Sequence, residues 1–248
     1  MNKCIALLSL SLLPFTAAAE HSDIWLTVNN NQVVISPVDL ETNLDVPIDI
    51  ATNRLLFTGD FSDVAGGDEG TSNPGFQAAV GTFSSNATIL YYRAVGELYS
   101  WNGSAWVNSV SDQEKISIFD ALSTETIWRT SGVTNAEGPI EQIASDGSFH
   151  HHRLYAISNS STPTAGAYLV DMEVYTTAGL NGTVVDAASE PFRIAFNYQL
   201  DDAEFDTAIA ALTTTVTATD VQVPMPLWAL CVLGFGLFVT GIRVKRHF

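Results

Sequence analysis

The chain has 248 residues, of which 46% are hydrophobic and 15% are charged, and its formal net charge at pH 7 is −17. This composition excludes a disordered, collagen-like or multi-span membrane protein. Every acidic residue lies between Glu20 and Asp220, whereas four of the ten basic residues lie at the two chain ends. The acidic middle part therefore excludes binding to nucleic acid or to anionic lipid through bulk charge.

The N-terminal segment has the three parts of a secretory signal peptide. Lys3 precedes a mostly apolar run from Ile5 to Leu13, and three alanines at 17–19 come directly before Glu20. A positive start, a short apolar run and a small-residue cleavage site are typical of exported proteins. We therefore expect residues 1–19 to be removed and the mature chain to begin near Glu20; an uncleaved anchor is the alternative.

The C-terminal segment combines a short apolar run with a basic end. Residues 227–242 carry no charge, and Arg243, Lys245 and Arg246 follow. A helix of this length spans about 24 Å, which is marginal for a hydrocarbon core of about 30 Å. The positive-inside rule keeps the basic end in the cytoplasm, so we expect residues 20–222 on the far side of the membrane.

This segment resembles the C-terminal sorting signals of PEP-CTERM proteins, which exosortase-type transpeptidases recognise in Gram-negative bacteria. The resemblance rests on Val223-Pro224-Met225-Pro226, the apolar run and the basic end. Met225 stands where the family motif has Glu, so this is a VPxP variant. The resemblance implies an exosortase-type processing partner and a place at the cell surface or outside the cell. A plain C-terminal helix that anchors the protein in the membrane is the alternative.

Between the two ends, the sequence predicts an all-β domain. Short runs rich in Val, Ile, Thr, Phe and Tyr alternate with Gly, Asn, Asp, Ser and Pro from Asp23 to Gln199. Many short strands at this spacing are typical of a β-sandwich or a related barrel. We expect a β-sandwich-like ectodomain at 20–212, an extended linker at 213–222 and a sorting or transmembrane helix within 223–248. The expected strands are 24–28, 32–36, 48–57, 75–82, 88–92, 98–101, 106–108, 115–119, 126–130, 149–157, 167–176 and 192–198.

Two local patterns in this domain are more specific. Apolar residues alternate with others along Phe192–Tyr198, which predicts a strand with one buried face. Asp201–Glu204 is acidic and begins the one expected helix, which ends near Leu212, because acidic side chains favour a helix N-terminus.

Asn102-Gly103 predicts a hairpin, because a tight turn needs residues that tolerate a positive φ. Trp101 and Trp106 flank this turn. They form either a packed cross-strand pair or a platform for carbohydrate.

Histidines are the most specific chemical feature of the domain. His21 lies at the expected mature N-terminus, and His150, His151 and His152 are consecutive. On a strand, His150 and His152 project to one face and His151 projects to the other. Two imidazoles spaced in this way can share one metal ion if a further ligand comes from elsewhere. A surface strand that merely tolerates the histidines is the alternative.

Several stretches resemble a family of exported PEP-CTERM β proteins, which includes members described as repressed by the zinc uptake regulator. They are residues 98–103, 146–152, 166–173 and 189–197, together with an H-x-D-I segment at 21–24. The resemblance implies metal ligands at His21, His150 and His152, with a water or a carboxylate such as Asp23 completing a zinc site. It gives His151 no role. It also implies that the first strand lies beside the strand that carries the histidines.

No common hydrolase, metalloprotease or nucleotide-binding motif occurs in the sequence, and both cysteines, Cys4 and Cys231, lie in the two ends of the chain. We therefore expect that the protein is not an enzyme.

Two functions are consistent with these patterns. The first function is that of an exported, envelope-anchored protein that binds zinc or a similar divalent metal through its histidines. The alternative is a structural or adhesive matrix protein without a metal.

Overall fold

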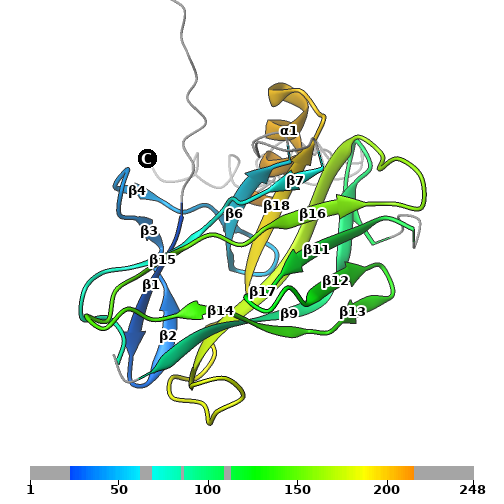
Figure 1. Cartoon of the computed structure of the whole chain (residues 1–248). Coiled ribbons are helices and arrows are strands. Elements are labelled where there is room, and N and C mark those ends of the chain that lie inside the picture. Colours follow the sequence, from blue (N-terminus) through cyan, green and yellow to red (C-terminus); the bar gives the residue numbers. More distant parts are fainter. Residues whose placement is uncertain (1–22, 62–68, 85–86, 109–112, 215–248) are drawn as a thin grey trace, which may run out of the picture. The chain divides into compact units, whose positions relative to one another are not determined.

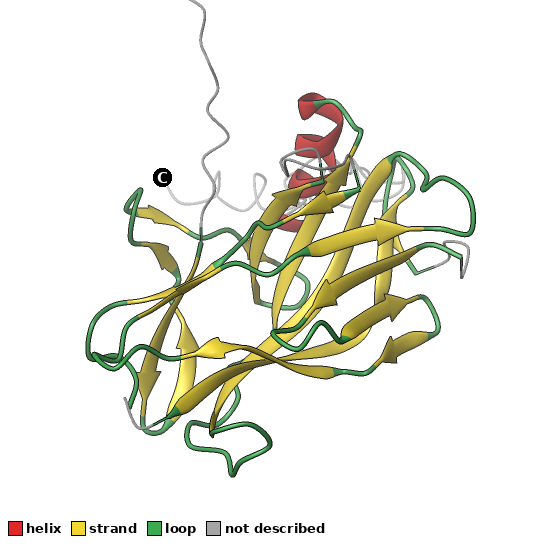
Figure 2. Ribbon diagram, viewed as in Figure 1, coloured by secondary structure: helices red, strands yellow, loops and turns green. Residues whose placement is uncertain are grey.

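The computed structural model describes residues 23–61, 69–84, 87–108 and 113–214 (Figure 1). The expected signal peptide, His21, most of the linker and the sorting segment at 223–248 lie outside these residues. The described part is mostly β-structure with one short helix, as the sequence predicts (Figure 2). Its elements are β1 (Ile24–Asn29), β2 (Gln32–Ile35), β3 (Val38–Asp39), β4 (Leu44–Asp45), β5 (Ile48–Asp49), β6 (Arg54–Asp60), β7 (Gly70–Thr71), β8 (Phe76–Ala78), β9 (Thr88–Trp101), β10 (Trp106–Val107), β11 (Lys115–Phe119), β12 (Glu125–Arg129), β13 (Gly132–Thr134), β14 (Glu137–Gln142), β15 (Phe149–His151), β16 (Tyr155–Ser158), β17 (Gly166–Ala178), β18 (Phe192–Tyr198) and α1 (Asp202–Thr213).

The described strands form four sheets of different sizes. The seven-stranded sheet has the order β10-β9-β17-β18-β6-β5, and β14 also pairs with β9. The five-stranded sheet has the order β13-β12-β11-β16-β7, the four-stranded sheet has the order β15-β8-β1-β2, and β3 pairs with β4. The long strands β9 and β17 are antiparallel, whereas β18 and β6 are parallel.

One apolar core joins the five-stranded and seven-stranded sheets. Trp128 of β12 and Tyr155 of β16 are fully buried, and the ring centroid of Tyr155 lies 5.1 Å from that of Phe196 in β18. The Nε1 atom of Trp128 donates to the backbone carbonyl of Asp171 in β17 at 3.2 Å. Burial of a large apolar side chain contributes about 1.5–3 kcal/mol, so these aromatic contacts are a main source of the cohesion between the sheets.

Strand β18 is buried on both faces, which corrects the expectation of a single buried face. Phe192, Ile194 and Phe196 enter the main core, as their alternation predicts. Ala195 on the opposite face is also buried, in a second cluster with Leu212 of α1. The helix covers this face of the sheet, and positions expected to meet solvent are therefore shielded from it.

Helix α1 confirms the predicted helix and its acidic start. The Asp201 carboxylate caps it by accepting from the backbone N–H of Glu204 at 2.8 Å. This contact satisfies one of the free N–H groups of the first turn. The helix continues through Thr213, the first residue assigned to the linker, and Thr214 caps its C-terminus. Among the described residues, no helix has both the length and the apolar character needed to cross a membrane.

The predicted hairpin at Asn102-Gly103 is present between β9 and β10. Trp101 pairs with Trp106, so the loop has four residues. Gly103 has a φ of 91°, which its missing side chain allows. The Nε1 atom of Trp106 donates to the backbone carbonyl of Ala208 in α1 at 2.9 Å. Trp106 therefore packs against the helix, which favours a packed pair over a carbohydrate platform.

The four-stranded sheet carries His150 and His151, and its layout corrects two expectations. The strand expected at 149–157 is two strands, because β15 ends at His151 and β16 begins at Tyr155 in the five-stranded sheet. His152 lies in the connection between the two sheets. Strand β1 is not beside β15, because β8 lies between them in the sheet.

Candidate metal site

The register of β1, β8 and β15 brings the candidate residues to one corner of the four-stranded sheet. Gln77 of β8 lies directly opposite His150 of β15, and β8 also pairs with β1. Opposite residues share a face of a sheet, and so do residues two positions apart along a strand. Continuing this register by two residues places Asp23, Gly75 and His152 in one row on the same face.

The other face of these strands belongs to the core. Ile24, Phe76 and Phe149 on that face are buried. His151 also projects to that side, and Arg153 Nη2 donates to its Nε2 atom. Burial, and then the charge of Arg153, lower the pKa of His151. His151 is therefore directed away from the face of His150 and His152, as the strand alternation predicts.

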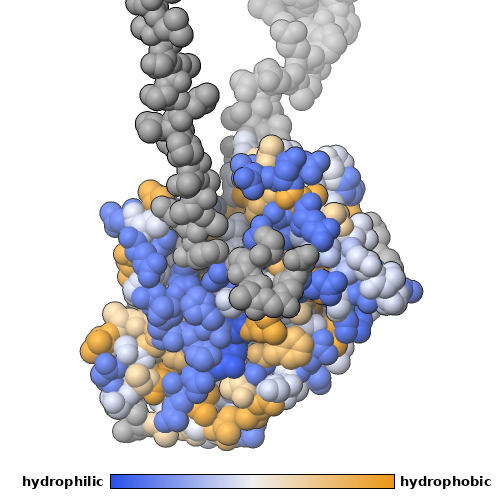
Figure 3. All heavy atoms as spheres, turned by 45° about the horizontal axis from the view of Figure 1, so that its top comes forward, coloured by the Kyte–Doolittle hydropathy of each residue, from blue (hydrophilic) through white to orange (hydrophobic). Residues whose placement is uncertain are grey.

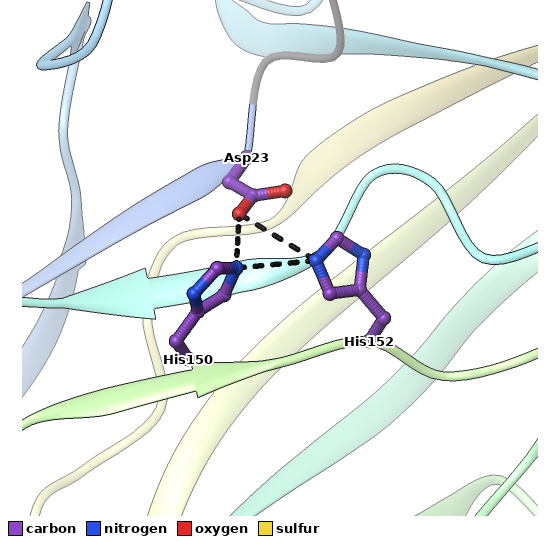
Figure 4. A group of neighbouring side chains, drawn as sticks. All are labelled: Asp23, His150 and His152. Carbon is purple, nitrogen blue, oxygen red and sulfur yellow. Dashed lines mark hydrogen bonds and ion pairs between the residues drawn. The ribbon is translucent and has the colours of Figure 1, made fainter.

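The ligand atoms of Asp23, His150 and His152 converge on one point (Figure 4). His150 Nε2 lies 3.0 Å from Asp23 Oδ2 and 3.2 Å from His152 Nε2. His152 Nε2 lies 3.8 Å from the same carboxylate oxygen. Ligand atoms of a tetrahedral zinc ion, with bonds of about 2.0–2.1 Å, lie about 3.3 Å apart. The three observed distances bracket that value, so an ion fits among these atoms after small side-chain rotations.

Burial differs among the three side chains. The Asp23 side chain is 7% exposed, whereas His150 is 57% exposed and His152 is 36% exposed. A buried carboxylate needs hydrogen bonds or a cation to compensate its lost hydration. The site is therefore an anionic group beneath two solvent-accessible imidazoles, a layout that lets an ion enter from water. Figure 3 shows that hydrophilic residues also form a continuous area on one face of the molecule.

A backbone carbonyl sets the proton position of His152. Its Nδ1 atom lies 3.0 Å from the carbonyl oxygen of Ser72. A carbonyl oxygen only accepts hydrogen bonds, so Nδ1 is assigned as the donor. Neutral His152 then presents the lone pair of Nε2 toward Asp23 and His150. Metal-binding histidines are commonly oriented by such a bond from their second nitrogen.

Two hydrogen bonds orient the Asp23 carboxylate. The backbone N–H of Gly75 donates to Oδ1 at 3.1 Å. The amide nitrogen of Gln77, in the orientation that its acceptor neighbours require, donates to Oδ2 at 3.2 Å and to Glu41 Oε1 at 3.2 Å. Oδ2 is thereby held toward the histidines.

Gly75 leaves the space in which the site forms. A Cβ atom on this residue would lie 2.5 Å from His152 Cε1, 2.6 Å from His152 Nδ1 and 2.8 Å from Asp23 Oδ1. Any other residue would therefore push the imidazole or the carboxylate away. Asp23 and His152 come together across this row only because Gly75, which lies between them, has no side chain.

The structure unites two of the three predicted histidines with the carboxylate that the sequence analysis gave as an example. His21 lies outside the described residues, so its predicted role stays a prediction. Ser72, Gly75 and Gln77 were not singled out from the sequence. A glycine after a proline reads as a turn, and a polar residue in a strand is ordinary. Neither pattern distinguishes these residues from others in the chain.

Comparisons with family models, curated proteins and solved structures gave no match for this chain. The donor atoms of the site indicate its chemistry. Two imidazole nitrogens and one carboxylate oxygen suit Zn²⁺ and the neighbouring divalent transition metals.

Proposed function

We propose that the protein binds zinc, or a similar divalent transition metal, through Asp23, His150 and His152. The observation that carries the proposal is the convergence of their ligand atoms at separations of 3.0, 3.2 and 3.8 Å. Hydrogen bonds from Gly75 and Gln77 to Asp23, and from His152 to Ser72, support this ligand set. Such outer contacts hold ligands ready for an ion and raise affinity.

Metal binding changes the position of one hydrogen in the cluster. His150 Nε2 faces two acceptors, Asp23 Oδ2 and the lone pair of His152 Nε2, so without metal it carries the hydrogen of this cluster. When Nε2 coordinates a divalent ion, the hydrogen of neutral His150 moves to Nδ1, and all three ligand atoms coordinate the ion. Neutral imidazoles therefore bind without net proton release, whereas protonated imidazoles must first lose a proton, so binding weakens below about pH 6.

The proposal includes export and anchoring in the envelope of a Gram-negative bacterium. It rests on the signal-peptide pattern at 1–19, the variant motif Val223–Pro226 and the apolar, basic tail. An exosortase-type enzyme is the proposed processing partner. The domain itself is proposed to be a β-sandwich, with the five-stranded and seven-stranded sheets as its layers around a shared core. The metal site then faces the extracytoplasmic space, where it captures or stores the ion.

The sorting part of the proposal is tested by mass spectrometry of the envelope form. We expect loss of the residues after Pro226 in the parent protein, and an intact tail when Pro224 and Pro226 are both changed to alanine. An intact tail on the parent protein would favour the plain membrane anchor instead. Digestion of the domain by protease in spheroplasts tests its location, and complete protection there would contradict export.

The metal part is tested by the metal content of the full chain, expressed with its own leader and purified without a histidine tag or chelator. We expect about one divalent ion per chain in the parent protein. The His150→Ala/His152→Ala variant should contain almost none. His151→Ala is the matched control, because it removes an imidazole from the opposite face, and it should retain the ion. A parent protein without metal would favour the structural, metal-free function.

A further inference from the structure

We infer that Glu41 is the fourth protein ligand of this metal, an inference that rests on the function proposed above. Glu41 is remote in sequence from the histidines, and it lies in the turn between β3 and β4. Its Oε1 atom shares the amide nitrogen of Gln77 with Asp23 Oδ2. The amide thus connects the carboxylate inside the cluster with a second carboxylate at its edge.

The turn anchors the backbone of Glu41 and leaves its side chain on the surface. The backbone N–H of Glu41 donates to Asp39 Oδ1 at 2.9 Å, and the Thr42 hydroxyl donates to Asp39 Oδ2 at 2.8 Å. Asp39 is 5% exposed, so the base of the turn is fixed against the fold. Glu41 itself is exposed. A glutamate in this setting can change rotamer without moving the chain.

The distances place Glu41 within reach of the ion. The Gln77 nitrogen lies 3.2 Å from both carboxylate oxygens, so Glu41 Oε1 and Asp23 Oδ2 are at most about 6.4 Å apart. Two oxygen ligands of one tetrahedral ion lie about 3.3 Å apart. Glu41 therefore has to approach by at most about 3 Å, which a rotation about its side-chain bonds supplies.

Charge gives the movement its driving force. Two neutral imidazoles and one carboxylate leave a divalent ion with a net charge of +1, and a second carboxylate neutralises the site. Without the ion, Asp23 and Glu41 repel each other, and the Gln77 amide between them reduces that repulsion. A cation between the two carboxylates turns the repulsion into attraction.

Four protein ligands would close the coordination shell. Structural zinc sites are closed in this way, whereas catalytic sites keep an open position for water or substrate. Glu41 as a ligand therefore indicates a site that retains its ion rather than one that uses it to activate water.

The test compares zinc affinity and Co²⁺ absorption in the full chain and in Glu41→Gln. Glu204→Gln is the matched control, because it removes the same charge from an exposed position on α1. We expect Glu41→Gln to lower zinc affinity by at least tenfold. Loss of a residue that only orients a ligand already lowers metal affinity by about that factor. The visible Co²⁺ bands should also change, because their intensity depends on coordination number. The control should match the parent in both measurements.

Three results would overturn the inference on Glu41. Equal zinc affinity in Glu41→Gln and Glu204→Gln would remove it and leave the proposed function intact. A lower affinity with an unchanged Co²⁺ spectrum would place Glu41 outside the coordination shell. If His21→Ala changes both readouts and Glu41→Gln changes neither, the fourth position belongs to His21. A parent protein that binds neither ion would instead overturn the proposed function together with the inference.

Discussion

Gly75 and His152 lie so close together that a Cβ atom on Gly75 would stand 2.5 Å from the Cε1 atom of the imidazole. The missing side chain is thus as much a part of the site as the ligands are. A substitution at Gly75 can therefore disturb the site without replacing any of the three ligand residues.

Gly75→Ala should lower zinc affinity by about ten- to a hundredfold, because the new methyl group displaces His152 and the Asp23 carboxylate. Overpacking should also cost about 1–3 kcal/mol of folding free energy. Calorimetric titration of zinc measures the first effect, and urea denaturation measures the second. Gly166→Ala is the control, since a Cβ atom there meets its nearest neighbour at an ordinary 3.6 Å. Parent-like zinc affinity in a folded Gly75→Ala variant would contradict the described geometry.

Asp23→Asn should separate the charge of Asp23 from its structural hydrogen bond. The asparagine oxygen can still accept from the backbone N–H of Gly75, which donates to Asp23 Oδ1 at 3.1 Å. Stability should therefore stay close to that of the parent, while zinc affinity falls because the anionic ligand is lost. Asp23→Ala should lose zinc affinity and also about 1–3 kcal/mol, because the buried N–H is left without an acceptor. Thermal and urea unfolding distinguish the two variants, and an Asp23→Asn protein with parent affinity would exclude Asp23 as a ligand.

Glu137 should make the fold more stable at neutral pH than in acid. Burial raises the pKa of Glu137, but hydrogen bonds from Arg93 Nε at 2.6 Å and from the Tyr175 hydroxyl at 2.9 Å outweigh it, so the pKa lies below its ordinary value. A carboxylate with a lowered pKa stabilises the fold above the pKa of the unfolded chain. That contribution is lost as the pH falls through the folded-state pKa. Solvent screens this half-exposed side chain, so the effect is below about 1 kcal/mol.

The measurement is the free energy of unfolding of the parent and of Glu137→Gln at pH 7 and about pH 3. The parent should be the more stable protein at pH 7, and the difference should disappear in acid. A difference between parent and Glu137→Gln that is equally large at both pH values would contradict the assigned cause.

Arg193 should contribute strongly to stability, although the strand pattern predicted an outward-facing side chain. It donates from Nε to Asp171 Oδ1 at 2.9 Å and from Nη1 to Asp49 Oδ2, and its side chain is 11% exposed. Arg193→Met leaves both buried carboxylates short of a partner and should cost about 3–5 kcal/mol. Lys115→Met is the control, because its pair with Glu125 is longer, at 3.7 Å, and should contribute no more than about 1 kcal/mol. Urea denaturation measures the free energy of unfolding of each variant. Equal losses of this free energy in the two variants would rule out a special role for the Arg193 network.

Much of the strand pattern is predictable from local periodicity. The strands at Lys115–Phe119 and Phe192–Tyr198 have the observed bounds, because apolar side chains follow the period of a strand there. The strand Glu137–Gln142 was not predicted, since it contains Gly138 and Pro139. It forms because it pairs with the long strand β9. A bulge between Pro139 and Glu141 accommodates the extra residue that would otherwise interrupt the pairing.

The site is less predictable than the strands. The spacing of His150 and His152 correctly indicates a shared face, which is a local property. Their carboxylate partner, Asp23, is placed by pairing across β8, and pairing between distant segments leaves no periodic signal in one sequence. The strand pattern at 149–157 is also continuous in the sequence, although the chain changes sheets within it. Tertiary packing therefore decides where His152 lies.

Calorimetric titration of zinc at neutral pH into the full chain and into His150→Ala/His152→Ala tests whether these side chains bind a metal. We expect one saturable site in the parent protein and loss of that site in the variant. His151→Ala should bind as the parent does, because His151 faces Arg153 on the core side of the strand. Equal zinc affinity in the parent and in the double variant, or no binding in the parent, would contradict the assignment of Asp23, His150 and His152 as a metal site.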